Sequence, residues 1–330
     1  MVANKILVAA SAIALGSLAL TACGNSDSSG SKSDGTITMG FAQVGAESGW
    51  RTANTKSVQE SAKDAGISLK FSDAQQKQEN QIKAIRSYIQ QKVDVIAFSP
   101  VVETGWDTVL LEAKRAHIPV ILTDRAVDTK DTSLYETFLG SDFVKEGEKA
   151  GQWLLDNAST SDVNGDGKIN VVEIEGTTGA APAIDRKKGF EDTIASDSTI
   201  KVVASQTGDF TRDGGKKVME SFLKSQKGID VLFAHNDDEG LGAIEAIEAA
   251  GLQPGKDIKI ITIDAVHDGM QALADGKISY IVECSPLLGP QLMDLAKKVV
   301  AGDPVEKRIV TEETTFTQEQ AVAALPSRKY

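Results

Sequence analysis

Hydrogen-bonding side chains follow the carboxyl ends of five apolar segments in this chain. In order, they are Ser99-Pro100, Asp124-Arg125, His235-Asn236-Asp237, Asp264 and Glu283. Carboxylate, amide and guanidinium groups placed together can donate to and accept from several hydroxyl groups at once. Any one of these residues could instead cap a helix or form a turn, so the inference depends on the whole set. The set predicts a binding site for a polyhydroxylated molecule, with sugars as the ligand class.

Two aromatic residues add flat apolar surfaces to this set. Trp50 lies in the segment 47–51, after the first predicted strand, and Phe210 lies in the segment 208–211. The face of an aromatic ring suits the C–H side of a sugar ring, although either residue could equally belong to a hydrophobic core. His235 adjoins an apolar strand, and we interpret it as a hydrogen-bonded wall residue and not as a catalyst.

Short apolar runs alternate along the chain with longer segments of helical periodicity. This alternation predicts parallel sheets with helices on both faces. In such sheets, ligands bind in the crevice outside the carboxyl ends of the strands, which is where the polar set lies. The predicted strands are 36–41, 67–72, 93–99, 118–122, 134–139, 169–175, 200–206, 229–234, 258–263 and 278–283, and the predicted helices are 51–64, 76–91, 105–116, 143–157, 183–195, 211–226 and 239–250.

Ten strands are too many for one ordinary doubly wound sheet. The sequence therefore predicts an α/β fold of two doubly wound parallel-sheet lobes, joined by a three-segment hinge and enclosing one polar cleft. We expect the N-terminal lobe to comprise residues 36–140 plus 284–305, and the C-terminal lobe residues 141–283 plus 306–330. The connecting segments are expected near 140–142, 264–266 and 283–286.

Residues 1–22 have the features of a lipoprotein signal peptide. Lys5 precedes an apolar run that is too short for a comfortable membrane span, and the segment Leu20-Thr21-Ala22-Cys23-Gly24 resembles the lipobox of bacterial lipoproteins. The alternative is an ordinary cleavage site at which Cys23 is incidental. Residues 23–35 are expected to be a flexible polar tether. Together these features predict an exported protein that is lipid-anchored to the cell membrane through Cys23 and faces outward.

Composition excludes several functional classes. The 330 residues include 35 Lys+Arg against 47 Asp+Glu, a formal net charge of −12. No basic stripe offsets this acidity, so nucleic acid and anionic membrane surfaces are poor partners. With 2 Cys and 3 His, the chain has no disulfide scaffold and little material for a zinc cluster or a His-dependent triad.

A longer set of motifs runs through the chain after the tether. They are 41–45, 47–51, 75–84, Pro100, 105–106, 123–125, 183–190, 208–212 and 234–237. These motifs resemble those of the sugar-binding proteins of ABC importers, which have the type I periplasmic-binding fold of the ribose- and galactose-binding group. Within this family the combination is most similar to galactofuranose-binding members, with fructose-binding members next.

The resemblance implies which residues contact the sugar. Without it, Arg186 would be interpreted as one member of a solvated charge run over 184–188. The implied contacts are Ser48, Trp50, Arg51, Asp124 and Arg125 from the first lobe, Arg186, Phe210, Asn236 and Asp264 from the second, and Glu283 at a crossover.

A separate motif matches the EF-hand calcium loop. Counted from Asp162, oxygen-bearing side chains occupy positions 1, 3, 5 and 9, and glycine occupies position 6. Glu173 falls at position 12, but a strand would carry it about 10 Å beyond Asn170. The resemblance to galactose-binding periplasmic proteins implies that a distant carboxylate, here Asp230, closes the shell. The implied Ca²⁺ ligands are Asp162, Asn164, Asp166, the Lys168 carbonyl, Asn170 and Asp230, and the alternative is a loop of turns without an ion.

Functions of three classes would use such a cleft. A glycoside hydrolase could employ Asp124, Asp264 and Glu283, but we expect Arg125 and Arg186 to keep neighbouring carboxylates ionised, which leaves no obvious proton donor. A sugar-sensing repressor would need an N-terminal helix-turn-helix and a basic face.

The predicted function is therefore that of a non-catalytic, monomeric substrate-binding protein of an ABC sugar importer. It is expected to bind a monosaccharide, galactofuranose or a similar furanose, and to present it to the permease subunits. Fructose, another pentose or hexose, and a role as a sugar sensor for a receptor are the alternatives.

Overall fold

The computed structural model describes residues 35–330. The predicted signal peptide, the lipidation site at Cys23 and nearly all of the tether lie outside the described residues. No helix in the described part is both long enough and apolar enough to cross a membrane.

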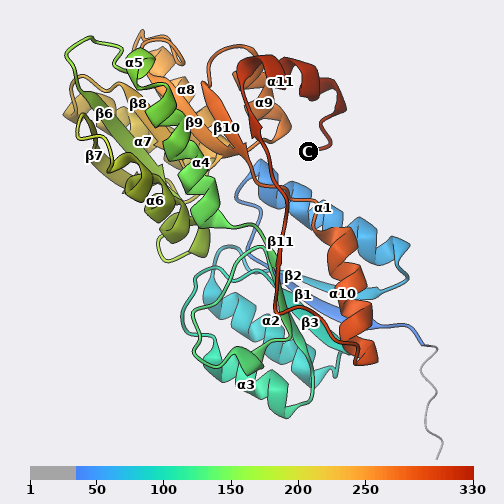
Figure 1. The fold of residues 1–330 in the computed structure, drawn as a ribbon. Coiled ribbons are helices and arrows are strands. Elements are labelled where there is room, and N and C mark those ends of the chain that lie inside the picture. The colour runs from blue at the N-terminus through green and yellow to red at the C-terminus, as the bar shows by residue number, and fades with distance from the viewer. Residues whose placement is uncertain (1–34) are drawn as a thin grey trace, which may run out of the picture. The chain divides into compact units, whose positions relative to one another are not determined.

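The first of two six-stranded sheets is parallel throughout, with the strand order β11-β5-β4-β3-β1-β2. Helices cover both of its faces (Figure 1). Its strands are β1 (Thr38–Gln43), β2 (Ser68–Asp73), β3 (Val95–Phe98), β4 (Val120–Thr123), β5 (Thr137–Gly140) and β11 (Arg308–Val310). Its helices are α1 (Gly49–Asp64), α2 (Gln78–Gln90), α3 (Asp107–Arg115) and α10 (Gly289–Ala301), with a short 3₁₀ helix at Thr132–Leu134.

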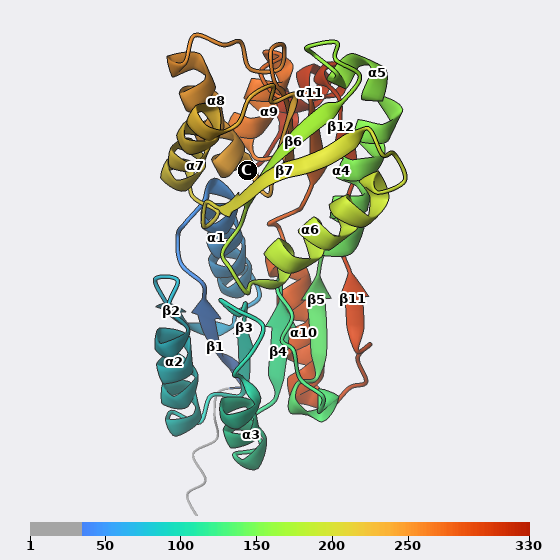
Figure 2. The same ribbon diagram turned by 90° about the vertical axis from the view of Figure 1, so that its left-hand side faces the viewer.

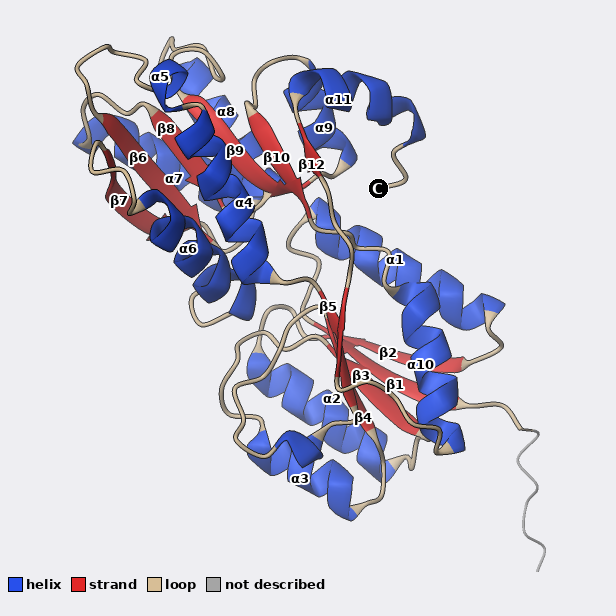
Figure 3. Cartoon of the chain, viewed as in Figure 1, coloured by secondary structure: helices blue, strands red, loops and turns tan. Residues whose placement is uncertain are grey.

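The second sheet has the order β12-β10-β9-β8-β6-β7, and only the β10–β12 pair is antiparallel. Figure 3 shows its strands between two layers of helices, as in the first sheet. Its strands are β6 (Ile169–Glu175), β7 (Ile200–Thr207), β8 (Val231–Ala234), β9 (Lys259–Asp264), β10 (Tyr280–Glu283) and β12 (Thr315–Phe316). Its helices are α4 (Phe143–Asp156), α5 (Ala158–Ser161), α6 (Ala181–Ile194), α7 (Arg212–Ser225), α8 (Asp237–Ala249), α9 (His267–Ala274) and α11 (Gln318–Ala324), followed by a 3₁₀ turn at Leu325–Ser327.

Alternation along the central strands builds a separate core on each face of a sheet. In β3, Val95 and Ala97 pack with α1 and α10, whereas Ile96 and Phe98 pack with α2 and α3. Successive side chains of a strand point to opposite faces, so a strand covered on both sides must be apolar at every position. The same alternation in the second sheet separates a core with α4 and α6 from one with α7, α8 and α9. The fold class predicted from the sequence is confirmed.

The chain passes between the two sheets three times. The first passage follows β5 at residues 141–142, the second lies between β10 and α10 at 284–288, and the third lies between β11 and β12 at 311–314. Figure 2 shows β11, coloured red, beside the green β5 of the first sheet.

Two expectations about these passages are wrong. Residues 264–266 do not connect the lobes, because β9 and α9 on either side of them both belong to the second lobe. The boundary expected at 305/306 lies further along the chain, because β11 pairs with β5 before the chain returns to the second sheet. Strands of three and two residues are too short to show the apolar alternation that predicts a strand, which is why β11 and β12 were not predicted.

Helices α4 and α6 approach each other backbone to backbone. A Cβ atom on Gly147 would lie 2.2 Å from the carbonyl oxygen of Arg186, and one on Gly189 would lie 2.1 Å from that of Val144. Only glycine permits this approach. The contact places Glu146 on α4 beside Arg186 on α6, and both side chains are buried.

Candidate functional site

A polar cleft lies between the two lobes at the carboxyl ends of their strands. Nine of the ten residues predicted to contact a sugar line it, and the empty space among the lining residues, open solvent included, is about 290 Å³. The predicted residues that line it are Ser48, Trp50, Arg51, Asp124, Arg125, Arg186, Phe210, Asn236 and Asp264, and Glu47, Pro182 and Cys284 complete the lining.

The lobes meet directly around this cleft. The backbone N–H of Gly49 donates to Asp238 Oδ2 at 2.7 Å, and that of Glu103 donates to the Gly179 carbonyl at 2.9 Å. Trp50, from the first lobe, packs into a core of the second lobe and donates from Nε1 to the Cys284 carbonyl at 2.7 Å. The structure therefore represents a closed arrangement of the lobes.

On the first-lobe wall, a buried guanidinium is held between two carboxylates. Arg51 Nε lies 2.9 Å from Glu47 Oε1, and Arg51 Nη1 lies 2.7 Å from Asp124 Oδ2. Ser99 Oγ also donates to Asp124 Oδ2, at 2.8 Å. Burial disfavours the charged form of Arg51, but Asp124 and Glu47 outweigh this effect and raise its pKa. This wall presents fixed charges to a ligand.

Arg125 extends from the first lobe toward the second. Its guanidinium lies over the ring of Phe210, 5.2 Å from the ring centroid, and Nη1 donates to the Val101 carbonyl at 3.2 Å. Burial, reinforced by the positive charge of Arg51, lowers the pKa of Arg125 to about 10. Arg125 Nε and Glu47 Oε2 are buried without a hydrogen-bond partner. Buried polar atoms are normally hydrogen-bonded, so these two atoms have unused hydrogen-bonding capacity in residues that line the cleft.

On the second-lobe wall, Arg186 is fixed by three groups. Its Nε donates to Glu146 Oε2 at 2.7 Å, its Nη1 donates to the His235 carbonyl at 2.6 Å, and its Nη2 lies 3.9 Å from Asp264 Oδ1. Burial opposes the charge of Arg186, but Glu146 raises its pKa. His235 itself is bonded to Glu173 at 3.1 Å and to the Gly176 N–H at 3.3 Å, as expected for a wall residue.

Asp264 differs from what the sequence led us to expect. We expected Arg186 to keep its neighbouring carboxylates ionised, but burial raises the pKa of Asp264 well above its ordinary value, and Arg186 only opposes that shift. A protonated Asp264 can donate a hydrogen bond to a ligand. The raised pKa of Asp264 runs against the expectation that Arg186 keeps this carboxyl group ionised.

Several cleft residues have a left-handed backbone. Asp124 has φ of 64°, Phe210 of 60° and Asp264 of 127°, values that non-glycine residues seldom adopt. Phe210 is held by the Glu239 carboxylate, which accepts its N–H at 2.9 Å, and by Asn236 Nδ2, which donates to its carbonyl at 3.1 Å. Such strain, where the surroundings enforce it, is typical of ligand-binding sites.

Two cleft residues are also helix caps, so capping a helix and lining the cleft are compatible roles. Ser48 Oγ accepts the N–H of Arg51 at the start of α1, and Asn236 Oδ1 accepts that of Glu239 at the start of α8. Capping fixes their side chains at the edge of the cleft.

Glu283 is not part of the cleft, which corrects one prediction. Its carboxylate binds Arg328 Nη1 at 2.8 Å and the hydroxyl of Tyr330 at 3.0 Å, close to the C-terminus. Side-chain directions alternate at the end of β10, so Cys284, and not Glu283, faces the cleft. Sequence reasoning also missed Glu47, although it lies within the motif 47–51, and Pro182, for which no chemical pattern exists.

The loop after α5 wraps around one carboxylate. Asp162 accepts backbone N–H groups from Gly165, Asp166 and Gly167 at 2.8, 3.1 and 2.9 Å. Asp230 does lie beside the loop, where its oxygens accept from Asn164 Nδ2 at 3.0 Å and from the Asn170 N–H at 2.9 Å.

These contacts fit a calcium ion only in part. Burial and the charges of Asp162 and Asp166 raise the pKa of Asp230, which a bound cation would relieve. Within residues 35–330, however, the loop carboxylates are not gathered into a common metal-ligand group, and the Asn164 amide would have to turn its oxygen inward. Calcium binding stays a prediction.

Comparisons with known proteins agree with the motifs. Residues 39–304 match a family model described as a periplasmic binding protein domain. The galactofuranose-binding protein YtfQ of Escherichia coli is 49% identical over 297 residues, which are 89% of this chain and 92% of that protein. The fructose import binding protein FruE of Bifidobacterium longum is 38% identical over 328 residues, 98% of this chain and 96% of that protein.

A solved structure gives the same result at the level of the fold. The crystal structure of a Mycobacterium smegmatis protein in complex with β-D-fucofuranose is 66% identical in sequence, with a TM-score of 0.87. The alignment covers 89% of this chain and 96% of that one. The resemblance inferred from the motifs is confirmed.

If the loop binds Ca²⁺, the ion should stabilise the second lobe without affecting the distant cleft. Calcium at about 10⁻² M, against a dissociation constant of about 10⁻⁴ M, should raise the free energy of unfolding by about 2–3 kcal/mol and raise the melting temperature. Asp162→Ala should abolish the increase, and the exposed Asp192→Ala should retain it. Equal melting temperatures for wild type and Asp162→Ala, with and without chelator, would leave only the interpretation as turns.

Proposed function

The chain belongs to the periplasmic binding protein domain family, and on that premise we propose that it is the substrate-binding protein of an ABC sugar importer. Its ligand is a monosaccharide in the furanose form, galactofuranose first and fructofuranose second. The observation that carries this proposal is the closed cleft lined by three buried guanidinium groups, three carboxyl groups and an amide, together with two aromatic rings. Relatives that bind galactofuranose, fucofuranose and fructose support the ligand class.

Closure of the lobes follows from the placement of these groups. Arg51, Asp124 and Arg125 belong to the first lobe, and Arg186 and Asn236 belong to the second. A sugar whose hydroxyls bind both walls stabilises the closed form relative to the open one. The closed form is then what the permease subunits recognise. The protein needs no covalent step for this role, and we infer that it acts as a non-catalytic monomer.

The aromatic residues favour the smaller ring. Arg51 lies over Trp50, 4.7 Å from the ring centroid, and Arg125 lies 5.2 Å from the centroid of Phe210. A guanidinium group therefore already lies over the ring of Trp50 and over that of Phe210. This leaves less aromatic surface free than is needed to stack both faces of a pyranose. A furanose with an exocyclic polyol arm needs less stacking and more polar contact at one end, which the paired charges supply.

We also infer that a lipid on Cys23 keeps the protein at the outer surface of the cell membrane. This inference comes from the sequence of residues 1–35 and from the exported character of the family. A flexible tether would let the sugar-binding unit reach the permease while remaining anchored.

The ring form can be tested with sugars that cannot mutarotate. Calorimetry should detect saturable binding of methyl β-D-galactofuranoside and much weaker binding of methyl β-D-galactopyranoside, because the cleft is small and its aromatic faces are partly covered. Saturable binding of the pyranoside, with no heat from the furanoside, would reverse the assignment.

The two walls can be tested by truncating one charge on each. Arg186→Ala and Asp124→Ala should each reduce furanoside affinity by about 2–4 kcal/mol, because they leave buried partners unpaired. Lys188→Ala, an exposed position on α6, is the matched control and should bind like wild type. Circular dichroism would verify that each variant is folded, and near-wild-type affinity in both Arg186→Ala and Asp124→Ala would refute the site.

The anchor can be tested separately from the site. Cys23→Ser should release the protein from washed cell membranes while leaving furanoside affinity unchanged, because the tether separates anchor and fold. A variant that stays in the membrane fraction would contradict lipid attachment at this residue.

A further inference from the structure

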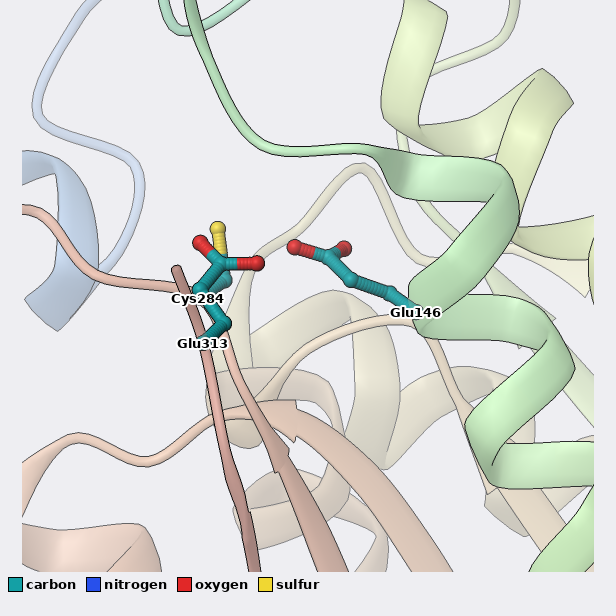
Figure 4. A group of neighbouring side chains, drawn as sticks. All are labelled: Glu146, Cys284 and Glu313. Atoms are coloured by element: carbon teal, nitrogen blue, oxygen red, sulfur yellow. The ribbon is translucent and has the colours of Figure 1, made fainter. Parts of the chain in front are cut away.

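The three segments that connect the lobes meet at one cluster, which consists of buried Glu146, buried Cys284 and partly buried Glu313. Each residue offers an atom, two carboxylate oxygens and a sulfur, and these atoms lie within 4.8 Å of one another. Figure 4 shows the carboxyl groups of Glu146 and Glu313 pointing toward each other. Glu146 stands on α4, just after the first connecting segment, Cys284 opens the second, and Glu313 lies in the third.

Glu313 binds all three connecting segments through one oxygen. Its Oε1 accepts from the hydroxyl of Ser141 in the first segment, from the N–H of Ser285 in the second at 3.1 Å, and from Thr311 Oγ1 in the third at 3.2 Å. Three donors on this oxygen leave Oε2 as the atom that can carry a proton.

Glu146 supplies the matching acceptor. Its Oε2 is bound to Arg186, while its Oε1 is buried without a hydrogen-bond partner. A buried and a partly buried carboxylate this close repel each other when both are ionised, and Arg186 lies on the other oxygen of Glu146. A proton on Glu313 turns the repulsion into a hydrogen bond and gives Glu146 Oε1 its missing donor.

We propose that Glu313 is a positioning residue for sugar binding: a proton shared with Glu146 ties the three connecting segments together and holds Arg186 in the cleft. The inference rests on the proposed function, because its effect is measured as a change in sugar affinity. Glu313 acts through Glu146 and Arg186 and does not itself line the cleft.

Burial and the charge of Glu146 favour the proton, against the positive charges nearby. The facing groups are Lys149 on α4, Arg186 on α6, Asp264 after β9, Cys284 in the second connecting segment and Arg308 on β11. Lys149 Nζ and Arg308 Nη2 bind the backbone carbonyls of Glu313 and Ser141, at 3.0 and 2.6 Å, and Arg308 also interacts with the charge of Glu313. Burial, followed by the charge of Glu146, raises the pKa of Glu313 to about 8.

Lobe closure and this proton are therefore linked. We expect that opening the lobes bends the connecting segments and admits water to the pair, which would lower its affinity for the proton. The closed form binds the proton more tightly, and by reciprocity the proton favours the closed, sugar-bound form. Because the pKa of Glu313 is raised in the folded protein, its contribution to stability is present at low pH and is lost as the pH rises through about 8.

The test compares wild type with Glu313→Gln, whose amide can donate to Glu146 Oε1 at any pH while its oxygen still accepts from the three segments. The probe is methyl β-D-galactofuranoside, measured by calorimetry from about pH 6.5 to about pH 9. We expect the Kd of wild type to rise by about tenfold over this range and that of Glu313→Gln by less than about twofold. The exposed neighbour Glu312→Gln is the matched control and should follow wild type, and Glu313→Ala should bind weakly at every pH.

A pH-independent Kd in wild type, or an equal rise in wild type and Glu313→Gln, would overturn the inference. The melting temperature of the sugar-free proteins is the second readout: it should fall between pH 6.5 and pH 9 by several degrees more in wild type than in Glu313→Gln. Absence of furanoside binding in every variant would refute the proposed function, and equal melting profiles would then refute the shared proton independently. A chelator should leave the furanoside Kd unchanged; loss of wild-type affinity on chelation, absent in Cys284→Ser, would assign the cluster to a metal ion instead.

Discussion

The need to pair buried guanidinium groups governs this molecule. Arg51, Arg125 and Arg186 are each no more than 3% exposed, and a charge removed from water is tolerated only with a counter-charge and satisfied hydrogen bonds. Glu47 and Asp124 meet this need on one wall, and Glu146 meets it on the other. The two apolar cores of each lobe hold these ion pairs at the facing ends of the strands. The fold therefore keeps the charged groups out of water and close to one another at the edge of the cleft.

Much of this arrangement follows from the sequence, for physical reasons. Parallel strands end at one edge of a sheet, so Asp124, Asn236 and Asp264 could be placed together from their positions after apolar runs alone. Arg186 could not, because it lies in the middle of a helix among other charges, and only the resemblance to the sugar-binding family identified it. Glu146 was not anticipated for the same reason: an acidic residue near the start of a helix is ordinarily solvated.

Other features were not predicted because the local sequence pattern does not determine which way a side chain points or which strands pair. Glu283 and Cys284 are adjacent at a strand end, and one position of offset decides which side chain enters the cleft. The third passage between lobes depends on the three-residue strand β11, whose pairing with β5 is a tertiary fact. The behaviour of Asp264 depends on the depth of its burial, a quantity that a sequence does not contain.

The contact of α4 and α6 through Gly147 and Gly189 means that substitutions in the cleft lining and substitutions at the helix contact have different consequences. Because the main chains of α4 and α6 are in direct contact, the backbone fixes the distance between Glu146 and Arg186. No side chain between the two helices sets that spacing. Residues that line the cleft, such as Phe210, can therefore be exchanged to suit a different sugar while the anchoring pair stays in register. Relatives that share this frame can diverge in selectivity without rebuilding the hinge, whereas a methyl group added at either glycine would disturb recognition of every sugar at once.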